Sequence, residues 1–270
     1  MRRVLTAAVI TPPALAAVFL LGPGPFFLVV LVTVELIAVE LTSITRRRAR
    51  GPLTAVYPLT ALCGAALSWP VLSQRLPENP ELIAVALGFA LSAGAALLVL
   101  LARTPLDDVV AATGTIGFAS LYLGIPLAAL VRVQAADPWL LFLLLAIVWL
   151  GDTAAYYFGT HFGRTLLAPT VSPKKTWEGA VANLAVGVVA AIACCLWRLG
   201  GLDWLLVGVA ALASIAGQLG DLIQSQFKRA AGVKDSGAFL PGHGGVWDRL
   251  DALLTAAPVW WIGLELLGRI

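Results

Sequence analysis

Charged residues are scarce in this chain. Of its 270 residues, 12% are Asp, Glu, Lys or Arg, whereas soluble domains average about 25%. Hydrophobic residues make up 60% of the chain, and they form long blocks instead of the short periodic stripes that a water-soluble core requires. This composition excludes an ordinary soluble domain and predicts one helical domain embedded in a membrane.

Cysteine and net charge are low as well. The three cysteines, Cys63, Cys194 and Cys195, lie inside apolar blocks and have neither disulfide-framework nor zinc-ligand spacing. We interpret them as small buried residues. The formal net charge of +3 is too small to indicate nucleic-acid binding. The sequence also contains no internal repeat or low-complexity tract, so the apolar blocks carry the prediction of fold.

A membrane-spanning helix needs about 20 mostly apolar residues, and Pro and Gly clusters separate segments of this length along the chain. The predicted fold is therefore an all-α polytopic membrane protein with about nine transmembrane helices. The candidate spans are 4–21, 25–42, 53–73, 81–101, 109–131, 138–159, 177–199, 202–222 and 252–268.

The positions of the basic residues predict the orientation. If the N-terminus is cytosolic, the inner segments carry 14 of the 18 Lys and Arg residues, and the outer segments carry Arg75, Arg132, Arg198 and Arg269. Positive residues favour the cytosolic side of a membrane. We therefore expect a multi-pass protein of the inner (cytoplasmic) cell membrane with its longer polar segments facing the cytosol.

The chain divides into N-terminal transmembrane helices, 1–137, and C-terminal transmembrane helices, 138–270. The second part contains two polar stretches, 151–179 and 221–251, which we predict to be catalytic segments facing the cytosol. In the first part the second span carries two acidic residues, Glu35 and Glu40. An acidic side chain in a span is costly, so these two either pair with arginines at the inner face or line a path for lipid.

The last polar stretch concentrates cations, carboxylates and glycines. Anionic phosphate esters need charge neutralisation from Lys, Arg or metal, and glycines allow backbone N–H groups to approach them. Mg²⁺ prefers oxygen ligands, usually one or two carboxylates plus substrate phosphates. Asp235, Asp248 and Asp251 could supply those carboxylates.

Four polar residues precede this stretch at helical spacing. Gln218, Asp221, Ser225 and Lys228 are separated by three, four and three positions, so a continuing helix would place them on one face. Asp221 lies at the inner end of an apolar span, where an ionisable group is costly and suggests function. The alternative is a solvated helix end, or a structural ion pair with Lys228.

The earlier polar stretch also suits an anion. It contains Asp152 after Gly151, and the run Ser172–Gly179, in which Ser172 and Pro173 are typical of an N-cap and a first helical position. A helix beginning there would point free N–H groups at an anion beside Lys174 and Lys175. The alternative is that the two lysines only mark the inner membrane face.

These residues carry a family resemblance. The run from Ser225 to Asp251 resembles, position for position, the signature Ser-x-apolar-Lys-Arg-x₄-Lys-Asp-x-small-x₂-apolar-Pro-x-His-Gly-Gly-apolar-x-Asp-Arg-apolar-Asp of phosphatidate cytidylyltransferases. Gly151-Asp152-Thr153 and the run Ser172–Gly179 are similar to the family's second conserved block. The resemblance covers roughly 146–251, whereas residues 1–137 match only in being apolar and helical.

The resemblance implies an enzyme of phospholipid biosynthesis, a nucleotidyltransferase that transfers CMP from CTP to phosphatidate and yields CDP-diacylglycerol and pyrophosphate with Mg²⁺. Its expected partners are CTP, phosphatidate and membrane lipid, with no nucleic acid, and the resemblance alone suggests a homodimer.

Roles follow for the individual residues. We predict two metal ions held by Asp221, Asp248 and Asp235, with Asp251 ranked lower. The predicted catalytic residues are Asp221, Asp248, Asp235, Lys234, Lys228 and Arg249. The predicted substrate-binding residues are Asp152, Lys174, Lys175, Ser225, Arg229, His243, Gly244 and Gly245.

Two rival functions remain. A CTP-dependent membrane kinase for polyprenol or phytol would transfer the γ-phosphoryl group and release CDP instead of pyrophosphate. A secondary transporter could also combine many helices with a few membrane carboxylates, but it would not need a glycine-rich inner segment dense in Lys and Asp.

Overall fold

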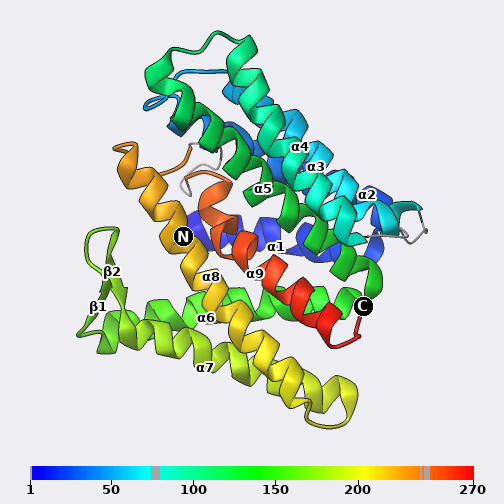
Figure 1. Cartoon of the computed structure of the whole chain (residues 1–270). Coiled ribbons are helices and arrows are strands. Elements are labelled where there is room, and N and C mark those ends of the chain that lie inside the picture. Colours follow the sequence, from blue (N-terminus) through cyan, green and yellow to red (C-terminus); the bar gives the residue numbers. More distant parts are fainter. Residues whose placement is uncertain (1, 74–79, 238, 240–243) are drawn as a thin grey trace.

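The structure is a computed structural model that describes residues 2–73, 80–237, 239 and 244–270. Within these residues the chain forms nine α-helices, one short antiparallel hairpin, one 3₁₀ turn and one π-helical turn (Figure 1). The helices are α1 Arg2–Leu20, α2 Pro23–Thr45, α3 Val56–Ser73, α4 Pro80–Leu101, α5 Leu106–Ala136, α6 Pro138–Phe162, α7 Trp177–Cys194, α8 Trp204–Ala230 and α9 Trp247–Leu266. The 3₁₀ turn is Leu53–Ala55, the π-helical turn is Cys195–Leu199, and the hairpin pairs β1 (Leu166–Ala168) with β2 (Ser172–Thr176).

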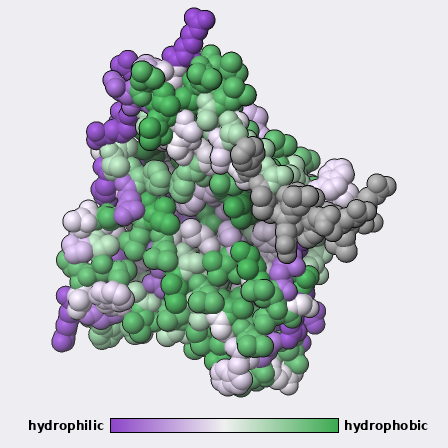
Figure 2. Space-filling view, in the orientation of Figure 1, coloured by the Kyte–Doolittle hydropathy of each residue, from purple (hydrophilic) through white to green (hydrophobic). Residues whose placement is uncertain are grey.

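The all-α polytopic fold is confirmed, since six helical segments among the described residues are long and apolar enough to cross a membrane. They are Pro23–Thr45, Leu53–Ser73, Leu106–Ala136, Pro138–Phe162, Trp177–Leu199 and Trp204–Ala230. The count of about nine spans stays a prediction. Helices α1 and α4 contribute shorter apolar stretches, Thr11–Leu20 and Ala86–Leu101. Helix α9 is not among the six, and its first turns carry three charged residues. Apolar side chains accordingly cover most of the face seen in Figure 2.

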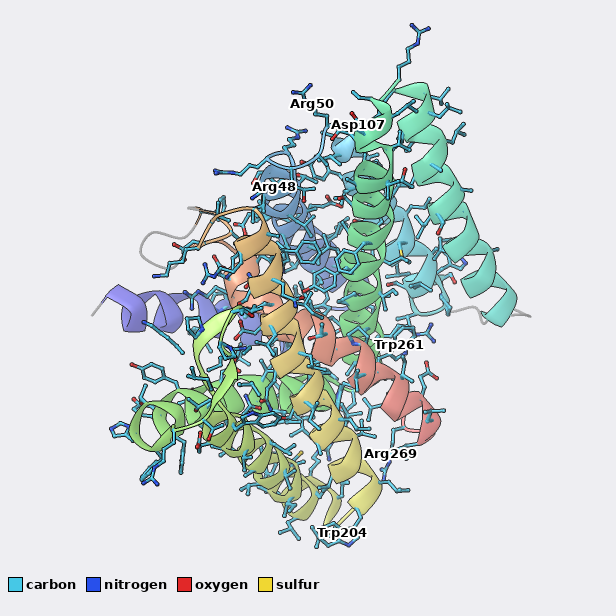
Figure 3. All side chains as sticks on the ribbon, turned by 60° about the vertical axis from the view of Figure 1, so that its left-hand side comes forward. Arg48, Arg50, Asp107, Trp204, Trp261 and Arg269 are labelled. Atoms are coloured by element: carbon cyan, nitrogen blue, oxygen red, sulfur yellow. The ribbon has the colours of Figure 1, made fainter. Side chains whose placement is uncertain are left out.

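Polar residues gather at the two ends of the helical bundle. Arg48, Arg50 and Asp107 lie at one end, and Arg269 lies toward the other (Figure 3). The hairpin and the C-terminal end of α8 lie on the same side of the molecule as the connections between α2 and α3 and between α4 and α5 (Figure 1). This arrangement agrees with the alternation of inner and outer segments predicted from the charges.

The helix ends follow from local chemistry. Asp137 and Asp203 cap α6 and α8: the carboxylate of Asp137 accepts a hydrogen bond from the N–H of Trp139 at 2.9 Å, and that of Asp203 accepts from the N–H groups of Leu205 and Leu206 at 3.1 Å. Such caps satisfy backbone donors that the first helical turn leaves unpaired.

One predicted helix start was wrong. Ser172 and Pro173 do not begin a helix, because Ser172–Thr176 is strand β2 and pairs with β1. Thr176 is the N-cap of α7, and its hydroxyl accepts a hydrogen bond from the N–H of Gly179 at 3.2 Å. Lys174 and Lys175 therefore lie on a strand that leads into the helix, not in its first turn.

One hydrophobic core connects both parts of the chain. It runs from Val18 on α1 to Leu264 on α9, and α5 packs against helices from both parts, including α3 and α9. In the C-terminal part α6 packs along α7, and α8 packs along α9. These two helix pairs carry the two predicted catalytic segments.

The contact between α8 and α9 depends on Gly220. A Cβ atom at Gly220 would lie 2.5 Å from the backbone oxygen of Asp251 and 2.1 Å from the hydroxyl of Thr255, and a backbone atom cannot move aside as a flexible side chain can. Gly208, on the same helix, has no heavy atom within 4 Å of the corresponding position.

We therefore expect Gly220→Ala to lower the melting temperature of the protein in detergent, because overpacking costs about 1–3 kcal/mol. The control Gly208→Ala should keep or slightly raise the melting temperature, since Ala favours a helix over Gly by roughly 0.5–1 kcal/mol. Equal melting temperatures for the two variants would show that the close contact between α8 and α9 is absent.

Candidate active site

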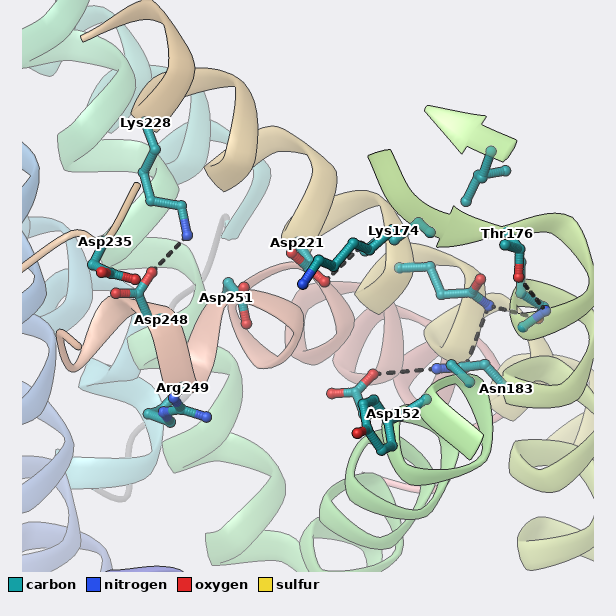
Figure 4. A pocket seen from close by; sticks show the side chains of 17 residues that line it. Asp152, Lys174, Thr176, Asn183, Asp221, Lys228, Asp235, Asp248, Arg249 and Asp251 are labelled. Atoms are coloured by element: carbon teal, nitrogen blue, oxygen red, sulfur yellow. Dashed lines mark hydrogen bonds and ion pairs between the residues drawn. The ribbon is translucent and has the colours of Figure 1, made fainter. Parts of the chain in front are cut away.

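A cleft of about 460 Å³ opens where the α6, β2 and α7 segment faces the α8 and α9 segment (Figure 4). Residues of both polar stretches that the sequence singled out line this one cleft. Polar side chains dominate its lining: Asp152, Tyr156, Lys174, Lys175, Thr176, Asn183, Gln218, Asp221, Lys228, Asp235, Asp248, Arg249 and Asp251. Most of the predicted site residues therefore converge, although they come from segments about 70 residues apart in the sequence.

The predicted polar face of α8 is confirmed. The helix continues to Ala230, and Gln218, Asp221 and Lys228 all line the cleft. Ser225 lies on the same face, where its hydroxyl donates a hydrogen bond to Asp221 Oδ1 at 3.4 Å. Helical spacing alone was sufficient to predict this alignment.

The carboxylate of Asp248 accepts hydrogen bonds from both neighbouring segments of the cleft. Lys228 Nζ lies 2.6 Å and Gln224 Nε2 3.0 Å from Oδ1. Oδ2 accepts from the N–H of Ser236 at 2.9 Å, from the Ser236 hydroxyl at 3.0 Å and from the N–H of Gly245 at 3.0 Å. Asp248 thus joins α8, α9 and the connection between them.

These donors control the ionisation of Asp248. Burial favours the neutral acid, but the hydrogen bonds from Lys228, Gly245 and Ser236 outweigh that effect and hold the pKa of Asp248 below its ordinary value. The group is therefore a carboxylate at neutral pH. A metal ion at Oδ1 would have to displace the hydrogen bond from Lys228 or Gln224.

Aromatic packing holds the start of α9. Trp247 is fully buried, and its ring lies 6.1 Å from that of Phe227 on α8 and 6.3 Å from that of Tyr122 on α5. Phe118 stacks on both Tyr122 and Phe227. Because Asp248 follows Trp247 directly, this cluster positions the carboxylate as well.

Asp152 belongs to a second hydrogen-bond network, centred on Asn183 of α7. Asn183 Nδ2 donates to Asp152 Oδ1 at 3.2 Å, and its Oδ1 accepts from Ser214 Oγ at 2.7 Å and from Gln218 Nε2 at 3.3 Å. Gly151 makes room for it, since a Cβ there would lie 2.8 Å from Asn183 Oδ1. Sequence reasoning missed Asn183, although a lone amide in an apolar helix was the available signal.

The two lysines of β2 reach the cleft from the hairpin. Lys175 Nζ lies 2.5 Å from Asp221 Oδ2, so this ion pair connects the hairpin with α8. The alternative interpretation of the sequence had paired Asp221 with Lys228 instead. Lys174 lines the same cleft. An anion in the cleft would therefore meet cations from three elements, β2, α8 and α9.

Other predicted residues lie away from the cleft lining. Arg229 donates from Nε to the carbonyl oxygen of Val171 at 3.3 Å and from Nη1 to that of Val233 at 3.1 Å, so it connects α8 to the tip of the hairpin. Lys234 is exposed. His243 lies outside the described residues.

The two predicted glycines contact Asp248. Gly244 has a left-handed backbone (φ +79°), and a Cβ there would lie 2.7 Å from Asp248 Oδ2. The N–H of Gly245 points to the same oxygen. Their predicted contact with substrate stays a prediction.

The carboxylates of the cleft suit Mg²⁺ only in combination with a bound phosphate. Among the described residues, no three His, Cys, Asp or Glu side chains lie close enough together to hold a metal ion by themselves. The carboxylates of Asp152, Asp221 and Asp251 nevertheless line one cleft, and Mg²⁺ commonly needs only one or two carboxylates plus substrate phosphates. The donor chemistry therefore fits Mg²⁺ bound together with a phosphorylated substrate.

Comparison with known proteins identifies the class. The model of the cytidylyltransferase family matches residues 1–267, so the chain belongs to this family. Its relatives include the phosphatidate cytidylyltransferase of Mycobacterium bovis (strain ATCC BAA-935 / AF2122/97), which is 39% identical over 140 residues, covering 52% of this chain and 45% of the relative. That of Staphylococcus aureus (strain COL) is 46% identical over 114 residues, covering 42% of this chain and 44% of the relative. The chain thus matches less than half the length of these curated relatives.

Proposed function

We propose that the protein is a phosphatidate cytidylyltransferase, which transfers CMP from CTP to phosphatidate and releases pyrophosphate. The observation that carries this proposal is the convergence of four cations, Lys174, Lys175, Lys228 and Arg249, with several carboxylates in one cleft of a membrane-embedded cytidylyltransferase-family chain. The relatives that bear this name support the same substrate pair.

We also propose that the cleft faces the cytosol from the inner membrane. Phosphatidate is a lipid whose phosphate lies at the membrane surface, whereas CTP is dissolved in the cytosol. A cleft at the inner ends of the helices brings the two together without moving either out of its own phase. The excess of Lys and Arg in the predicted inner segments supports this orientation.

In the proposed reaction a phosphate oxygen of phosphatidate attacks the α-phosphorus of CTP. A new P–O bond forms, the bond between the α-phosphorus and the bridging oxygen breaks, and pyrophosphate leaves with that electron pair. The phosphomonoester is already largely ionised near neutral pH, since its second pKa is about 6. No strong base is therefore required, and positioning and charge stabilisation supply most of the catalysis.

The cleft residues divide by the element that carries them. Lys174 and Lys175, on β2, are assigned to the triphosphate of CTP, and Lys228 and Arg249, on α8 and α9, to the phosphate of phosphatidate. Asp152, held by Asn183, lies on the β2 side of the cleft and is assigned to the nucleotide. The four cations would donate charge-assisted hydrogen bonds to the phosphates, whereas the Asp152 carboxylate could accept from the ribose hydroxyls.

Mg²⁺ is part of the proposal, with two ions at the site. Asp221, Asp248 and Asp235 remain the predicted ligands, and the geometry favours Asp251, which the sequence analysis ranked lower. One oxygen of Asp251 accepts a hydrogen bond from the N–H of Ala252 at 2.9 Å, whereas both oxygens of Asp248 are engaged by several donors. Bound Mg²⁺ would neutralise the charge that develops on the reacting phosphates.

The proposed function predicts the products. Purified protein in detergent, incubated with CTP, phosphatidate and Mg²⁺, should release equal amounts of pyrophosphate and CDP-diacylglycerol. Asp248→Asn should abolish both products, because an amide cannot accept from all five donors and cannot balance the charge of Lys228. The products are quantified by phosphate assay and lipid chromatography.

The matched control is Asp107→Asn, an exposed aspartate in the first turn of α5, which should retain full activity. Release of CDP in place of pyrophosphate would instead identify a CTP-dependent kinase. Full activity of Asp248→Asn would remove Asp248 from the site.

The metal assignment has its own test. Mg²⁺ should raise the melting temperature of the wild-type protein in the presence of CTP, and Asp251→Asn should increase the Mg²⁺ concentration needed for half of that rise by about 10–100-fold. Arg249→Gln serves as a comparison that alters the cleft without removing a carboxylate. An unchanged Mg²⁺ requirement in Asp251→Asn would exclude Asp251 as a ligand.

A further inference from the structure

Glu40 lies far from the cleft residues in sequence but contacts the segment that carries them. It lies near the C-terminal end of α2 and is only 7% exposed. Its Oε1 accepts a hydrogen bond from the N–H of Val246 at 2.8 Å. Its Oε2 accepts from the N–H of Trp247 at 3.0 Å and from the Ser236 hydroxyl at 2.7 Å. The predicted pairing of Glu40 with arginines is thus replaced by a contact with the start of α9.

These bonds satisfy a specific need of α9. The first N–H groups of a helix have no partner within the helix, and a buried N–H without a partner costs about 1–3 kcal/mol. A carboxylate at this position also interacts favourably with the positive end of the helix dipole. Val246 has no side-chain capping bond of its own. Glu40 therefore caps α9 from another helix.

Two glycines form the space in which the Glu40 carboxylate lies. A Cβ at Gly245 would lie 2.2 Å from Glu40 Oε2 and 2.1 Å from Ser236 Oγ, and a Cβ at Gly237 would lie 2.8 Å from Glu40 Oε1. Both positions therefore exclude any larger residue while Glu40 is in place. The sequence suggested that the glycines of this region bind phosphate. In the structure two of them make room for the carboxylate of Glu40.

Ser236 connects Glu40 with Asp248. Its hydroxyl lies 2.7 Å from Glu40 Oε2 and 3.0 Å from Asp248 Oδ2, and its single proton is shared between the two carboxylates. The N–H of Ser236 donates to Asp248 as well. A displacement of Glu40 would thus also shift Asp248, because Ser236 contacts both carboxylates and the first turn of α9 carries Asp248.

We propose that Glu40 is a positioning residue of the active site: by holding Ser236, Val246 and Trp247, it sets the position of Asp248, Arg249 and Asp251 in the cleft. This inference rests on the proposed function for its effect on the reaction. The contact itself is independent of that function. It also gives the N-terminal part of the chain a direct role in the geometry of the site.

Glu40→Gln is the central test variant. It keeps the size of the side chain but replaces one oxygen with an NH₂ group, which faces N–H and O–H donors and cannot accept from them. We expect kcat to fall by about 10–100-fold, the usual cost of removing a group that orients a reactive residue. The KM for CTP should change little, because Lys174 and Lys175 lie on a different element.

The matched control is Glu35→Gln, the same change five residues away on the same helix. Ser236→Ala removes one of the three donors to Glu40 and should reduce kcat by a smaller factor than Glu40→Gln. Hydrogen exchange gives a readout independent of activity: the amides of Val246 and Trp247 should exchange faster in Glu40→Gln than in wild type, and at the wild-type rate in Glu35→Gln.

The outcomes separate the two proposals. If wild-type protein forms no CDP-diacylglycerol, the proposed function fails, and the exchange of Val246 and Trp247 still decides whether Glu40 holds α9. If the wild-type protein is active, the positioning role is overturned by a Glu40→Gln variant with unchanged kcat. It is equally overturned if the Val246 and Trp247 amides of that variant exchange hydrogen at the wild-type rate. Should Glu40→Gln fail to fold, Ser236→Ala decides, and wild-type kcat in that variant would contradict the proposal.

Discussion

The largely buried carboxylate of Asp248, whose side chain is 9% exposed, imposes a constraint that organises this end of the molecule. A carboxylate among apolar helices is costly unless a cation and hydrogen-bond donors surround it. Asp248 obtains them from α8 through Lys228 and Gln224, and from the α8–α9 connection through Ser236 and Gly245. These elements must therefore meet around one group, and their meeting forms one wall of the cleft.

The same constraint explains how an apolar scaffold can hold a polar site. At the other wall Asp152 accepts a hydrogen bond from Asn183. Asn183 in turn accepts hydrogen bonds from Ser214 and Gln218. The Lys175–Asp221 ion pair joins the two walls. A phosphorylated substrate between them would meet cations already fixed by carboxylates, so little reorganisation would be needed on binding.

Local patterns predicted much of this structure, and packing between distant segments decided the rest. Long apolar runs located the helices, and the spacing from Gln218 to Lys228 predicted the polar face of α8. The start of α7 was misplaced because Ser172 and Pro173 also suit a strand when Leu166–Ala168 is available as its partner. Asn183 and the bond from Glu40 to α9 escaped prediction, since each depends on which helices are neighbours, and no local spacing encodes that.

We propose that residues of two helix pairs form one nucleotide site at the cytosolic end of a membrane-embedded bundle. The most direct measurement is labelling of Leu167→Cys, a cleft-lining position on β1, with a membrane-impermeant thiol reagent, in a protein whose Cys63, Cys194 and Cys195 are replaced by Ala. A nucleotide site on the cytosolic side predicts labelling in inside-out but not right-side-out vesicles, and protection by CTP with Mg²⁺. Labelling from the outer side, or labelling that CTP does not slow, would contradict it.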